Sequence, residues 1–120
     1  MKTYQKEIGD IGEGIAAQYL EGLGYKLLER NYKTRYGELD LIMMDLEDIV
    51  FVEVKTRTSD TFGMPESSIS TGKLGRLQNA ALLWLQEHPD ASDNWRIDVI
   101  AILIDRLKNV KDLQHFVNVQ

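Results

Sequence analysis

Residues 37–57 read GELDLIMMDLEDIVFVEVKTR, which is two apolar runs separated by the polar tetrapeptide DLED. Runs this rich in Ile, Val and Phe on either side of a short polar turn predict two antiparallel strands, at 38–44 and 49–57. Charged side chains nevertheless interrupt the runs, at Glu38, Asp40, Glu53 and Lys55. The feature that most restricts the fold is therefore a hairpin that resembles core and yet carries charges.

The register of this hairpin brings the charges together. Side chains at i and i+2 share a face of a strand, and pairing across the DLED turn places Asp40 opposite Glu53 and Glu38 opposite Lys55. A cross-strand ion pair accounts for the second pair. The first is a like-charge contact that destabilises a sheet by roughly 0.2–1 kcal/mol. Mg²⁺ or Mn²⁺ would compensate it, because these ions prefer carboxylate oxygens.

The apolar spacing elsewhere predicts the other elements. Stripes at three- and four-residue intervals predict a helix at about 5–22 and another from an N-cap at Ser70 to about His88. Further strands are expected at 25–32, 95–104 and 113–119, and a long polar loop at 58–72. The resulting order, α-β-β-β-α-β-β, predicts the α/β class, with a mixed β-sheet flanked by helices.

Composition limits the remaining possibilities. A chain of 120 residues can form one hydrophobic core, so we expect a single domain spanning residues 1–120. The absence of a long apolar run or signal core indicates a cytoplasmic protein without membrane contact, and the absence of cysteine excludes thiolate metal sites. The net charge of −5 counts against binding nucleic acid through charge alone, although the basic residues concentrate at or before Arg76.

Longer stretches of the chain resemble a known family. Asp40 followed after twelve residues by Glu53-Val54-Lys55 resembles the D…ExK signature of the PD-(D/E)XK nuclease superfamily, with Leu39 where the superfamily's name has Pro. GDIGEGIAAQYLEGLGYKLLERNYKTRYGELDLI, VFVEVKTR, GK at 72–73 and RIDVIAI resemble the UPF0102 (YraN) family, which is similar in fold to archaeal Holliday junction resolvases. The resemblance implies a restriction-endonuclease-like sheet and, as in those resolvases, a homodimer.

The resemblance also implies roles for individual residues. Asp40 and Glu53 would be metal ligands, Val54 would lend its backbone carbonyl, and Lys55 would be the catalytic lysine. Glu13 on the first helix would be an accessory carboxylate. Helix geometry by itself places Glu13 at the border of the packed face, which also suits a solvated flank residue.

Other charged residues are candidates for different tasks. Arg57 shares a strand face with Lys55 and is a better candidate than Lys73 or Arg76 for binding a nucleic-acid phosphate. Lys73 and Arg76 near the start of the second helix are further candidates, and a solvated helix start explains them as well. Arg96 and Asp98 are best interpreted as a structural ion pair, and His88 and His115 have no ligand-like spacing.

These observations favour a Mg²⁺- or Mn²⁺-dependent endonuclease that hydrolyses phosphodiester bonds of DNA, with branched DNA among the candidate substrates. Two alternatives remain open. The chain could be a nucleic-acid-binding module without nuclease activity of its own, which its acidic charge slightly favours, or an interaction protein that only retains the fold.

Overall fold

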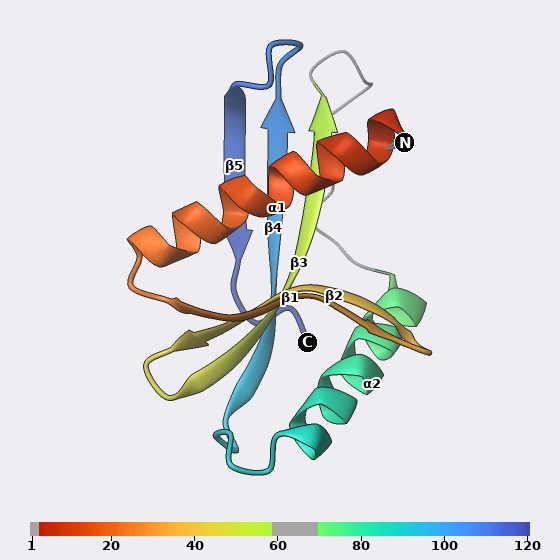
Figure 1. Ribbon diagram of the computed structural model, residues 1–120, viewed down its shortest axis with the longest axis vertical. Coiled ribbons are helices and arrows are strands. Elements are labelled where there is room, and N and C mark those ends of the chain that lie inside the picture. The colour runs from red at the N-terminus through yellow and green to blue at the C-terminus, as the bar shows by residue number, and fades with distance from the viewer. Residues whose placement is uncertain (1–2, 59–69) are drawn as a thin grey trace.

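The computed structural model describes residues 3–58 and 70–120, and these form two helices and five strands (Figure 1). Their order confirms the predicted α-β-β-β-α-β-β arrangement and the α/β class. Most of the predicted loop at 58–72 lies outside the described residues. The last strand covers Val110–Phe116, which is earlier in the chain than the predicted 113–119. The elements are α1 Tyr4–Gly22, β1 Lys26–Thr34, β2 Gly37–Asp45, β3 Asp48–Thr58, α2 Thr71–Glu87, β4 Trp95–Ile104 and β5 Val110–Phe116.

The strands form one mixed sheet in the order β1-β2-β3-β4-β5. Neighbours are antiparallel except β3 and β4, which are parallel because α2 lies between them in the chain. The Ser70 hydroxyl accepts a hydrogen bond from the Lys73 N–H at 3.2 Å, which confirms the predicted N-cap of α2. None of the helices in the described chain has the length and apolar character that crossing a membrane requires.

The two helices cover opposite faces of the sheet. Figure 1 shows α1 running across β3, β4 and β5, and its buried Ala16, Ala17 and Leu20 belong to one core cluster with Val52 and Ile100. The second cluster joins α2 to the other face and is built around Leu77, Ala81, Trp84, Phe51 and Ile97. Almost all of β4 is buried, as its apolar sequence predicts for a strand covered on both sides.

Gly12 brings α1 unusually close to β3. A Cβ atom at this position would lie 1.7 Å from the Oγ1 atom of Thr56, whereas a Cβ at Gly14 would have no neighbour within 4 Å. Glycine is therefore required at position 12 by packing rather than by backbone conformation. The contact fixes the distance between the helix and the strand at the level of the next residue, Glu13.

The regular ladder between β2 and β3 ends just before it reaches the charged residues. Their pairing runs from Asp45–Asp48 to Leu41–Val52 and stops there. The predicted pairing of Asp40 with Glu53, and of Glu38 with Lys55, as neighbours in a regular ladder is therefore wrong. The physical reason is that the Asp40 side chain replaces a backbone carbonyl as hydrogen-bond acceptor. Its Oδ2 atom accepts the Val54 N–H at 2.8 Å.

The first two strands are irregular at the same place. Leu41 packs with α1 and Leu39 packs with α2, although residues two apart in a regular strand share a face. On β1, the pairs Arg30–Leu41 and Tyr32–Leu39 flank Asn31, whose φ of 53° is left-handed. Asn31 and Asp40 therefore lie opposite each other at the point where both strands break their alternation.

Candidate metal centre

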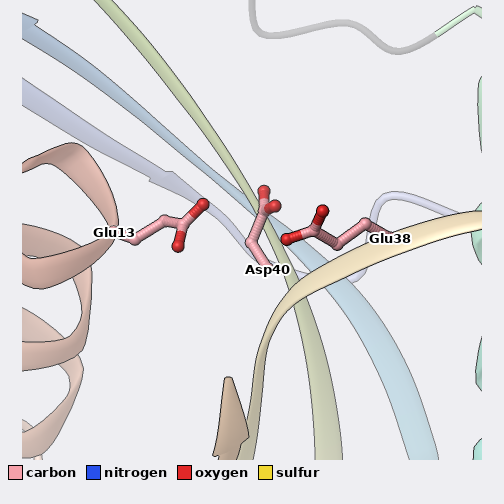
Figure 2. A group of neighbouring side chains, drawn as sticks. All are labelled: Glu13, Glu38 and Asp40. Atoms are coloured by element: carbon pink, nitrogen blue, oxygen red, sulfur yellow. The ribbon is translucent and has the colours of Figure 1, made fainter. Parts of the chain in front are cut away.

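Asp40 is at the centre of a group of carboxylates. Glu13 on α1 and Glu38 on β2 each have a carboxylate oxygen close to one of Asp40, and the three atoms lie within 4.8 Å of one another. Figure 2 shows Glu13 and Glu38 pointing toward Asp40 from opposite sides. Three acidic oxygens at this spacing, supplied by a helix and a strand, could bind one hard divalent cation.

Asn31 connects two members of this group. Its Nδ2 atom donates hydrogen bonds to Glu13 Oε1 and to Glu38 Oε1, both at 2.8 Å. Arg30 adds a weaker contact, with its guanidinium 3.8 Å from Glu13 Oε1. The buried Glu13 carboxylate is therefore oriented by β1 as well as by its own helix.

Glu53 extends the acidic group toward α2. Its side chain is buried, and the Lys73 Nζ atom lies 3.2 Å from its Oε2 atom. That contact lacks hydrogen-bond geometry, so Oε2 has no hydrogen-bond partner among the described residues. A buried carboxylate oxygen without a donor is costly and suits an additional cation.

The environment changes the ionisation of Asp40. Burial raises the pKa of its carboxyl to about 9, and the negative charge of Glu53 and a hydrogen bond with Glu53 act in the same direction. The Val54 N–H opposes this change because it stabilises the charged form. A carboxyl that retains its proton near neutral pH would release it when a cation binds.

A pocket of about 370 Å³ opens from this group toward α2. Asp40, Glu53 and Glu38 contribute its acidic wall, and Lys73 and Arg76 contribute positive charge from the first turns of α2. The structure thus brings Lys73 and Arg76 to the predicted metal ligands. Lys73 additionally contacts one of them, Glu53, which the sequence did not predict.

Lys55 and Arg57 lie beside a different pocket. Beyond Val54 the pairing of β3 with β2 has ended, and the edge of β3 and the start of α1 form a pocket of about 470 Å³. Lys55, Arg57 and the exposed Tyr4 are among its lining residues. The predicted catalytic lysine, Lys55, therefore lines this second pocket, whereas Glu53, two residues earlier on β3, lines the acidic one.

Sequence reasoning found most of this group but missed one member. Asp40 accepts the Val54 N–H and lies beside Glu53, and Glu13, for which two interpretations were open, is buried beside Asp40. Glu38 lies in the same group, and Asn31 was overlooked. The available signal was an Asn within a predicted strand, because Asn is rare in strands and tolerates positive φ.

A second group of charged residues surrounds the buried carboxylate of Asp98. Asp98 is on β4, which is next to β3 on the side away from β2. It accepts hydrogen bonds from Arg96 Nε at 3.0 Å, from the Asn118 N–H at 2.9 Å and from His115 Nε2 at 2.8 Å. Arg96 also contacts Asp45 and Asp48, each at 3.3 Å. The structural ion pair expected from the sequence is present, and His115, isolated in the sequence, belongs to it.

Comparison with known proteins gives a consistent result across the chain. The family model described as "Uncharacterised protein family UPF0102" matches residues 12–102. A UPF0102 protein of Syntrophomonas wolfei is 47% identical over 113 residues, covering 94% of this chain and 96% of that protein. Another, from Pelotomaculum thermopropionicum, is 43% identical over 118 residues and covers 98% of both chains.

Proposed function

The chain belongs to the UPF0102 family, and we propose that it is a metal-dependent endonuclease that hydrolyses phosphodiester bonds of DNA. The observation that carries this proposal is the surroundings of Asp40. Its carboxyl is held by the Val54 N–H where β2 leaves β3, and Glu13, Glu38 and Glu53 surround it. Like charges gathered in this way are expensive for a sheet and are typical of a cation site.

The donor set suits Mg²⁺ or Mn²⁺. Both ions prefer oxygen ligands, and the carboxylates of Asp40 and Glu53 supply them. In an extended strand the N–H and C=O of a residue point to the same side, so the Val54 carbonyl faces the same gap as the N–H that binds Asp40. The Oε2 atom of Glu53, which has an ion-pair contact with Lys73 but accepts no hydrogen bond from the described residues, supports the same assignment.

The chemistry divides between the ion and the protein. A bound divalent cation supplies charge stabilisation to a scissile phosphate and lowers the pKa of water. We assign Lys55, two residues after Glu53 on β3, to the scissile phosphate or the attacking water, as a donor that can orient either one. Glu13 and Glu38 fix the position of Asp40 and add negative charge that attracts the cation.

Cationic side chains flank the acidic group on both sides. Lys73 and Arg76 line the pocket next to α2, and Arg57 lines the pocket at the edge of β3. We propose that these three contact the phosphates of the DNA backbone on either side of the cut. The three cationic side chains would bind the DNA at a local positive region. A chain with a net charge of −5 needs such a region, because its overall charge repels DNA.

The experiment combines metal binding with cleavage. Mg²⁺ and Mn²⁺ are titrated calorimetrically into the wild type, Asp40→Asn and the control Asp112→Asn, which alters a carboxylate on β5 at the far edge of the sheet. The same samples are then incubated with duplex, single-stranded and four-way-junction DNA. We expect the wild type and the control to bind metal and cleave at least one substrate, and Asp40→Asn to do neither.

Two other results would replace the proposal. Salt-dependent DNA binding without metal binding or cleavage would identify a nucleic-acid-binding module. No binding of either metal or DNA would leave the acidic group as a remnant of the fold and indicate an interaction protein. Sedimentation of the wild type with and without junction DNA tests the homodimer that the resemblance to resolvases implies.

A further inference from the structure

We propose that Asn31 is a positioning residue, which holds Glu13 and Glu38 in place for the cation that Asp40 binds. The inference rests on the proposed function, because it assigns a further residue to the same site. Asn31 is on β1, which supplies none of the expected ligands. Its task would be carried out entirely through the two glutamates that it contacts.

The hydrogen bonds are the first argument. One side-chain nitrogen donates to two different carboxylates, Glu13 Oε1 and Glu38 Oε1, at 2.8 Å each. An amide NH₂ has two protons, so both donors are used. Hydrogen bonds to ionised acceptors are among the stronger ones in proteins, and these two hold like charges together before any cation arrives.

The backbone is the second argument. Asn31 has a φ of 53° in the middle of a strand, where extended residues have negative φ. Asn is one of the few residues with a side chain that tolerates this conformation. An unusual conformation at this position costs free energy, and it is the position opposite Asp40 where both strands lose their alternation.

The two glutamates that Asn31 contacts come from different parts of the chain. Glu13 comes from α1 and Glu38 from β2, so their separation depends on how two distant segments pack. Asn31 spans that separation directly. Replacing the outer residues that hold a metal site in position typically weakens metal binding by about 10–100-fold.

The test uses Asn31→Gly with Asn118→Gly as the matched control. Glycine accepts positive φ without strain, so the first change removes the amide and preserves the backbone. Asn118 also has a positive φ, of 55°, and interacts with Asp98 only through its backbone N–H. Calorimetric titration of Mn²⁺ into folded protein should show about 10–100-fold weaker binding for Asn31→Gly and wild-type affinity for the control.

A second measurement keeps the wild-type chain and covers the case in which Asn31→Gly does not fold. The side-chain amide signals of Asn31 are followed by NMR during titration with diamagnetic Mg²⁺. They should shift along the same binding curve as the calorimetric signal. A merely structural side chain would keep its signals and leave metal affinity unchanged on replacement.

The outcomes separate the two proposals. If the wild type binds Mn²⁺ and Asn31→Gly binds it equally well, or Asn118→Gly weakens it as much, Asn31 has no positioning role and the proposed function stands. If the Asn31 signals do not respond to bound Mg²⁺, the positioning role is also wrong. If the wild type binds neither ion, the proposed function fails and the positioning role with it.

Discussion

Two aspartates of the same sheet, one fully buried and one half-buried, have opposite surroundings. Asp98 on β4 is fully buried and receives hydrogen bonds from Arg96, His115 and a backbone N–H. Asp40 on β2 receives one from a backbone N–H and is otherwise near Glu13, Glu38 and Glu53. The protein itself compensates the first carboxylate, whereas the second is surrounded by further acidic side chains, which is the basis of the proposed cation site.

The ionisation of the two groups expresses this difference. Burial by itself would raise the pKa of Asp98, but hydrogen bonds from His115, Asn118 and Arg96 hold it below its ordinary value. Burial raises the pKa of Asp40 to about 9, and its acidic neighbour Glu53 reinforces the change. A buried acidic side chain alone therefore does not indicate a functional site, because its neighbours decide whether the protein itself stabilises the charge.

The strongest test of the comparison is Asp98→Asn. Removing one partner from a buried charge network leaves the other groups uncompensated, so we expect the free energy of unfolding to fall by about 3 kcal/mol or more at pH 7. The folded-state pKa of Asp98 is depressed, so its stabilisation is present above the ordinary value of 3.8 and disappears as the pH falls through the lower folded-state value. Urea unfolding at pH 7 and pH 3 measures both effects. If Asp98→Asn left the free energy of unfolding at pH 7 unchanged, Asp98 would not have the structural role assigned to it here.

The same substitution at Asp40 should have the opposite sign. A raised folded-state pKa means that the wild type loses stability as the pH rises from about 4 to about 9, by at most about 1.4 kcal/mol per unit. The Asp40→Asn variant does not lose this stability, because the asparagine side chain does not ionise. In EDTA the variant should therefore be more stable than the wild type at pH 8 and similar to it at pH 4.

Urea unfolding in EDTA at these two pH values checks the Asp40 prediction. A saturating concentration of Mn²⁺ should stabilise the wild type and reverse the order at pH 8. If Asp40→Asn were destabilising in EDTA at pH 8, Asp40 would resemble Asp98 and the contrast between the two clusters would be lost.

The smallest expected effect concerns how α1 delivers Glu13 to the acidic group. Gly12→Ala places a methyl group against Thr56 Oγ1 and should cost about 1–3 kcal/mol of stability through overpacking. Gly14→Ala meets no neighbour within 4 Å and should stabilise the helix by up to about 1 kcal/mol. Thermal unfolding of the pair measures the difference, and equal effects would show that close contact between α1 and β3 is not needed.

Much of the fold and some of the site could be predicted because both depend on local patterns. Apolar spacing gave the helices and strands, and the order of elements gave a mixed sheet. The D…ExK spacing indicated Asp40 and Glu53. The register beyond Leu41 could not be predicted, because the Asp40 side chain replaces a backbone acceptor there and ends the ladder.

The sequence by itself determined which carboxylates were available and which strands would carry them, because alternation and helical periodicity are properties of neighbouring residues. Only the tertiary structure decided how those charges are compensated. Asn31 reaches Glu13 across 18 positions of the chain, and His115 reaches Asp98 across 17. Contacts between separate segments depend on packing, and packing decides that Asp98 is surrounded by hydrogen-bond donors whereas Asp40 is surrounded by other carboxylates.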